Sequence, residues 1–135
     1  MGLFTPKRPK SSTAAVELGF ALARSSEHKA AGRLAEALRH VEEARDAIFG
    51  EAVTRLRDSE PAEVVVALDT RERIGGWVAL LAEEADLASR RGEPTESRRL
   101  YERALAIQER HVEHAASGHE AIQLSIRALR VKLQG

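Results

Sequence analysis

The feature that most constrains this fold is an apolar stripe that recurs every three or four residues. Its clearest stretch reads Leu34, Leu38, Val41, Ala44, Ile48, Ala52 and Leu56. Alternating steps of three and four place these side chains on one face of an α-helix. Glu42, Glu43, Arg45 and Asp46 lie off the stripe and are expected to face solvent. The pattern therefore predicts a helix with a single buried face.

Similar periodicity on both sides of this stretch predicts an all-α protein. A first helix is expected to start after a cap at Ser11, Ser12 or Thr13 and to run to about Ala31, before Gly32. A third helix is expected over residues 61–91, and a last helical segment from residue 94 to residue 133. We therefore expect four to five helices, packed as antiparallel hairpins in a TPR-like or bundle arrangement, with a long C-terminal helix.

The domain organisation follows from length and from the composition of the N-terminus. A chain of 135 residues suits one domain. Residues 1–11 carry two prolines and three basic residues with little to bury, so we expect a flexible basic arm there. Residues 12–135 are expected to form the single helical domain.

Composition excludes several classes of function. The chain has no cysteine, so disulfides, zinc–thiolate sites and thiol catalysis are excluded. Basic and acidic residues number 21 each, which disfavours a general nucleic-acid binder. No segment has the uninterrupted apolar length of a membrane span. Glu17 interrupts the apolar run at residues 14–23, which favours a cytoplasmic amphipathic helix over the alternative, a secretory signal.

Two features of the third helix have alternative interpretations. Gly75 and Gly76 favour a kink or a break between two shorter helices, and the alternative is close contact with a neighbouring helix or ligand. Trp77, the single tryptophan, is expected to anchor the core. The alternative for Trp77 is an interface hot spot, so we retain it as a candidate interaction residue.

The last helical segment has a stripe that keeps its phase from Tyr101 to Leu133. Residues 117–120 read as a capping box that would start a separate helix at Gly118, but the unbroken phase favours one continuous helix. Such a helix needs more apolar cover than a small monomer readily provides. We therefore expect its far end to pack against a second copy or a partner protein. The residues of this candidate surface are Ile122, Ile126, Leu129 and Leu133.

The string Gly92-Glu93-Pro94-Thr95-Glu96-Ser97-Arg98-Arg99-Leu100-Tyr101-Glu102-Arg103-Ala104-Leu105-Ala106-Ile107 resembles the second half of a tetratricopeptide repeat, closest to the kinesin-light-chain-like kind. Residues 32–44 resemble the same half-repeat again. The resemblance implies helical hairpins, with Gly92 in the turn and small Ala104 between the helices. It implies an adaptor that binds another protein. The family's Asn residues, which grip peptides in some members, are absent because the chain contains no asparagine.

Histidines offer the one pattern that suggests an enzyme. His111 and His114 lie three residues apart, and His119 follows. Imidazole and carboxylate groups bind zinc or iron, so these histidines with Glu113 or Glu120 are candidate metal ligands. No histidine has a glutamate three residues before it, as helical di-iron sites require. We interpret these histidines as structural and expect no metal, no cofactor and no catalytic residue.

Adjacent glutamates are expected to be surface charge. Glu83-Glu84 and Glu42-Glu43 are neighbours in sequence, and such neighbours do not face each other on a helix. The expected function is therefore a cytoplasmic, non-catalytic protein–protein interaction module. The alternatives are a homodimeric structural bundle or, less favoured, a metal-dependent enzyme that uses His111, His114 and His119.

Overall fold

The computed structural model describes residues 10–135, and residues 1–9 of the expected arm lie outside this range. The described residues form seven α-helices and no strand. The helices are α1 (Lys10–Ala30), α2 (Leu34–Phe49), α3 (Ala52–Asp58), α4 (Pro61–Leu68), α5 (Arg71–Arg90), α6 (Pro94–His114) and α7 (His119–Gln134). The all-α class is confirmed, whereas the expected number of four to five helices is wrong.

The additional helices arise from breaks at residues with positive φ. Gly50 (φ 60°) separates α2 from α3, Asp69 (φ 68°) separates α4 from α5, and Gly118 (φ 76°) precedes α7. A positive φ does not fit a right-handed helix, so each of these residues ends or precedes one, and glycine adopts it without the clash of a β-carbon. The expected continuous C-terminal helix is therefore wrong, because the chain reverses between His114 and His119.

The third predicted helix breaks at a different place from the one expected. Thr70 caps α5, and its Oγ1 accepts a hydrogen bond from the Arg73 backbone N–H at 3.2 Å. Gly75 and Gly76 lie inside α5 rather than at a kink or break. A β-carbon at Gly76 would lie 3.7 Å from atoms of Leu18 and Phe49. Close approach to the neighbouring helices α1 and α2 therefore explains Gly76.

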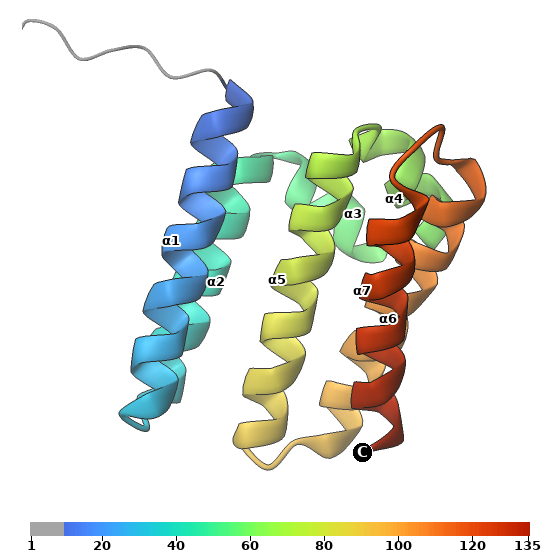
Figure 1. Cartoon of the computed structure of the whole chain (residues 1–135). Helices are drawn as coiled ribbons and strands as arrows, with labels where there is room; N and C mark the ends of the chain where they lie inside the picture. The colour runs from blue at the N-terminus through green and yellow to red at the C-terminus, as the bar shows by residue number, and fades with distance from the viewer. Residues whose placement is uncertain (1–9) are drawn as a thin grey trace, which may run out of the picture.

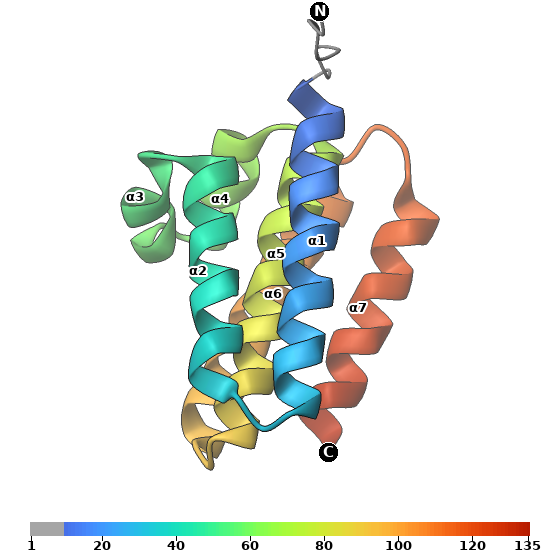
Figure 2. The ribbon, with the colours of Figure 1, turned by 90° about the vertical axis from the view of Figure 1, so that its left-hand side faces the viewer.

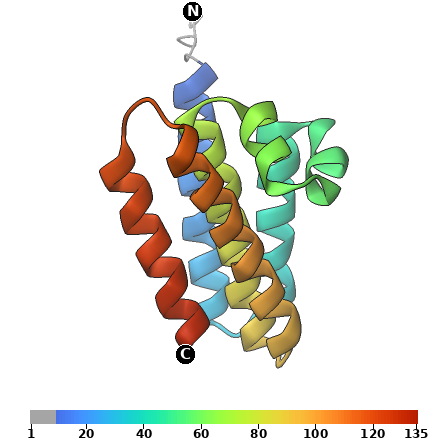
Figure 3. The same ribbon diagram turned by 90° about the vertical axis from the view of Figure 1, so that its right-hand side faces the viewer.

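The helices form two layers around a shared core. In Figure 1, α1, α5 and α7 stand side by side from left to right, while α2 and α6 lie behind them. Figures 2 and 3 show that α3 and α4 sit on the α2 side of the molecule, at the far side from α7. Consecutive long helices pair antiparallel, with contacts of α1 to α2, α5 to α6 and α6 to α7.

Two of these hairpins have the same turn, 60 residues apart. Gly32 (φ 78°) and Gly92 (φ 79°) occupy the left-handed position. In the first turn, the Arg33 N–H donates to the carbonyl of His28 at 2.8 Å; in the second, the Glu93 N–H donates to that of Ala88 at 2.9 Å.

The helices that follow these turns also bury equivalent positions. At equivalent positions of α2 and α6, both residues are buried: Ala37 and Ser97, Val41 and Tyr101, and Ala44 and Ala104. The α1–α2 and α5–α6 hairpins therefore share a turn geometry and a burial pattern at a spacing of 60 residues. Helices α3 and α4 lie between the two hairpins in the chain.

Candidate binding groove

The residues predicted to form an interaction surface are buried inside the chain. Trp77 is 0% exposed and packs edge-on against Phe49, with ring centroids 5.1 Å apart. On α7, Ile122, Ile126 and Leu129 are buried and Leu133 is half-buried against the core. The stripe was expected to pack against a second copy or a partner protein; within the described chain, α7 folds back on α6 and covers its own apolar face.

The three predicted histidines have different environments. His111 is 5% exposed, while His114 and His119 are exposed. Within residues 10–135, no group of three or more His, Asp or Glu side chains is placed to hold a metal ion. The His111 Nδ1 atom lies 2.9 Å from Gln108 Oε1, and Gln108 Nε2 donates to Ser125 Oγ at 3.1 Å. His111 therefore belongs to a buried polar link between α6 and α7.

Burial also sets the charge of His111. Desolvation lowers the pKa of its imidazole, and the positive charges of Arg71 and His119 lower this pKa further. With an unperturbed pKa near 6.5, the ring is neutral at pH 7. Neutral imidazole has one donor nitrogen and one acceptor nitrogen. Nδ1 donates to Gln108 Oε1 in this arrangement, which leaves Nε2 as an acceptor.

Helix α5 lies between α1 and α7 in one layer, and Figures 1 and 2 show this arrangement. We call the face that these three helices share the α1–α5–α7 groove. Gly75, Ala79 and Ala82 follow one another at helical spacing on α5 and are half-buried. Small side chains along the floor let the backbone of a ligand approach α5 closely.

One end of the groove opens into an apolar pocket of about 590 Å³. Leu18 on α1, Phe49 at the end of α2, Gly76 on α5 and Ile122 on α7 line it, together with the buried pair Gln108 and His111. Its size lies within the range of about 300–1,000 Å³ that is usual for ligand pockets.

The mouth of this pocket lies at the first turn of α5. Arg71, Glu72 and Arg73 all line it. The Arg73 guanidinium lies over the Phe49 ring, 5.5 Å from the ring centroid. Arg71 packs over Gly118, because its side chain occupies the space that a β-carbon there would need. Neither arginine forms an ion pair with another side chain in the described part of the chain.

The other end of the groove is polar. Lys29 Nζ on α1 lies 2.8 Å from Glu83 Oε2 and 2.9 Å from Asp86 Oδ2 on α5. Burial by itself would lower the pKa of Lys29, but hydrogen bonds and charge from Asp86 and Glu83 raise it overall. Glu83 also accepts a hydrogen bond from Ser25, which is fully buried. These contacts join the first hairpin to the second.

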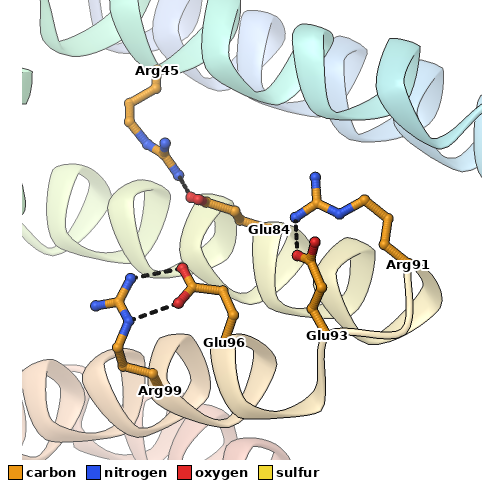
Figure 4. Close-up of polar contacts among 6 residues, drawn as sticks. All are labelled: Arg45, Glu84, Arg91, Glu93, Glu96 and Arg99. Atoms are coloured by element: carbon orange, nitrogen blue, oxygen red, sulfur yellow. Dashed lines mark hydrogen bonds and ion pairs between the residues drawn. The ribbon is translucent and has the colours of Figure 1, made fainter.

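A second ion pair joins the hairpins at the core. Arg45 on α2 is 1% exposed, and its Nη2 lies 2.7 Å from Glu84 Oε1 on α5, as Figure 4 shows. Its guanidinium also lies over the Trp77 ring, 5.6 Å from the centroid. The predictions that Arg45 faces solvent and that Glu83-Glu84 is surface charge are therefore wrong. Both carboxylates are half-buried because α2 and α1 pack on that face of α5.

The sequence carried only a weak signal for these sites. Arg45 directly follows Ala44 and precedes Ile48 by three residues, so it borders the apolar stripe. Gln108 and His111 lie three apart on the stripe of α6, where polar side chains interrupt apolar ones. A polar residue on a buried stripe indicates a structural partner or a lined cavity, but periodicity alone does not distinguish them.

Comparisons of the chain with protein-family models, curated proteins and solved structures found no significant match. Among the helices of residues 10–135, none has the length and apolar character needed to cross a lipid bilayer.

Proposed function

We propose that this chain is a cytoplasmic, non-catalytic protein–protein interaction module of tetratricopeptide-like architecture. Its binding face is the α1–α5–α7 groove. The observation that supports this most strongly is the repeated hairpin turn at Gly32 and Gly92. Because of this repeated turn, α1 and α5 are the first helices of two similar hairpins. Helix α7 lies in the same layer as α1 and α5. Arrays of such hairpins use the surface formed by one layer of helices to bind partners.

The chemistry of the groove also supports a protein partner. The floor at Gly75, Ala79 and Ala82 has room for the backbone or small side chains of a bound segment. An apolar pocket lies at one end of the groove and the Lys29 ion pairs lie at the other. Because the two ends of the groove differ in chemistry, an extended or helical segment would bind in one orientation. This fixed orientation gives specificity.

A charged side chain placed on the groove floor tests this proposal. Ala82→Arg adds a long cation to the half-buried floor, whereas Val66→Arg adds the same group on α4, where Val66 is 78% exposed and outside the groove. In affinity capture from native extract, we expect Ala82→Arg to recover at least tenfold less partner than wild type. We expect Val66→Arg to match wild type.

Circular dichroism of both variants checks that they remain folded. If Ala82→Arg recovered as much partner as the wild type and Val66→Arg recovered less, the groove would not be the surface that binds the partner.

A second candidate, a homodimeric structural bundle, is favoured by the outer face of α7. Leu124 and Val131 are both more than half exposed and lie seven residues apart, on one side of the helix. A chain that captures only its own copies, and that sediments as a dimer broken by Leu124→Glu, would favour this candidate.

A further inference from the structure

The apolar pocket at the end of the groove combines three features that point to a particular ligand. It is large enough for a flexible chain, at about 590 Å³, and nine of its fifteen lining residues are aliphatic, aromatic or glycine. Two arginines without an ion-pair partner among the described residues flank its mouth. The pocket also contains a nearly fully buried polar side chain, His111, with one ring nitrogen that has no hydrogen-bond partner within the described residues.

The mouth favours an anion over a cation. Arg71 and Arg73 each carry a positive charge, and Glu72 is the one carboxylate that lines the pocket. The same three residues form the first turn of α5, a helix of 20 residues, where free backbone N–H groups attract negative charge. The capping hydroxyl of Thr70 already accepts from the Arg73 N–H, but the N–H groups of Arg71 and Glu72 have no acceptor within the described chain.

The interior favours an aliphatic chain. Leu18, Phe49 and Ile122 reach the pocket from three different helices, and Gly76 leaves its floor without a side chain. Of the polar residues that line the pocket, only Gln108 and His111 are buried. A ligand that fits must therefore have one charged end and a long apolar remainder.

We propose that this pocket binds a medium-chain fatty acid. The alkyl chain lies between Leu18, Phe49 and Ile122, and the carboxylate lies at the first turn of α5 beside Arg71 and Arg73. This goes beyond a role in protein binding, because the acid occupies only the apolar end and leaves the floor at Ala79 and Ala82 free. The module therefore has a small-molecule site adjacent to its protein-binding face.

Titration calorimetry of the full-length chain with decanoate and dodecanoate, each below its micelle concentration, tests the proposal. Each buried methylene contributes about 0.8 kcal/mol, which corresponds to about a fourfold gain in affinity, so dodecanoate should bind about fifteenfold more tightly than decanoate. Dodecyl maltoside, which has the same chain without the charge, should bind at least tenfold more weakly. Fluorescence of Trp77 reports occupancy independently, because Trp77 contacts Phe49 in the pocket lining.

Two matched variants of α7 locate the site. Ala121 is exposed and lines the pocket, so Ala121→Trp should fill its mouth and abolish saturable binding. Ala128 is exposed on the same helix and does not line the pocket, so Ala128→Trp should bind dodecanoate as wild type does.

The double variant Arg71→Gln/Arg73→Gln should lose at least tenfold in affinity for dodecanoate and keep its weak affinity for dodecyl maltoside. Circular dichroism confirms that each variant is folded.

Three results would overturn the proposal: no saturable binding by the wild type, equal binding by Ala121→Trp, or equal affinity for the acid and the uncharged maltoside. These results do not depend on whether a protein partner is captured. The fatty-acid site and the protein-binding role can therefore fail separately.

Discussion

Glu84→Ala is expected to lower the free energy of unfolding by about 3–5 kcal/mol. The loss is large because the Arg45 guanidinium stays in the core without its counter-ion. Arg45 is 1% exposed, and its Nε and Nη1 atoms already have no hydrogen-bond partner within the described residues. Only the contact to Glu84 Oε1 at 2.7 Å and the face of Trp77 compensate its charge. Urea unfolding of the single variant measures the effect.

A double variant distinguishes the net contribution of the ion pair to stability from the penalty of leaving one buried charge unpaired. Arg45→Met/Glu84→Leu replaces both charges with apolar side chains of similar volume. Its free energy of unfolding should lie within about 1 kcal/mol of the wild-type value or exceed it. Arg45→Met, Glu84→Leu and the double variant form a thermodynamic cycle with the wild type. If Glu84→Ala cost less than 1 kcal/mol, Arg45 would have another route to solvent or to a partner, and the buried ion pair would not join the hairpins.

Gly32→Ala and Gly92→Ala are each expected to lower the free energy of unfolding by about 1–2 kcal/mol, and by equal amounts within about 0.5 kcal/mol. A β-carbon at either position would meet no atom within 4 Å, so the cost comes from the left-handed backbone alone. That backbone is nearly identical at the two turns, with φ of 78° and 79°. Gly19→Ala supplies the control in urea unfolding.

Gly19 lies inside α1 without a positive φ and with open space around it, so alanine there should raise the stability by about 1 kcal/mol. Unequal losses at Gly32 and Gly92, beyond about 1 kcal/mol, would contradict the structural equivalence of the two hairpins.

The apolar stripe was sufficient to predict the long helices, because one buried face repeats with helical period whatever it packs against. Helices α2 and α6 follow the stripes that begin at Leu34 and Tyr101, and the turn at Gly92 lies where the resemblance to a tetratricopeptide repeat placed it. The helix breaks were harder to predict. Asp69 and Thr70 end one helix and cap the next within an apolar run, while Gly75 and Gly76, the weaker helix formers, stay helical because α5 is packed on several sides.

The candidate site depended on information that periodicity does not contain. The stripe of Ile122, Ile126 and Leu129 indicated an apolar face that needs cover, but it did not indicate that this cover is the chain's own α6. The pocket depends on the ends of α2 and α6 meeting the starts of α5 and α7, which lie far apart in sequence. Arg45 was assigned to solvent because it lies off the apolar stripe that begins at Leu34.

Site-specific photocrosslinking tests the central claim, that the α1–α5–α7 groove is the surface that binds a protein, most directly. A photoreactive phenylalanine analogue replaces Ala79 on the groove floor and, as a matched control, Phe20, which is 63% exposed on α1. In native extract, we expect one dominant adduct with another protein from position 79 and none from position 20. Adducts that form from position 20 alone, or only between copies of this chain, would contradict it.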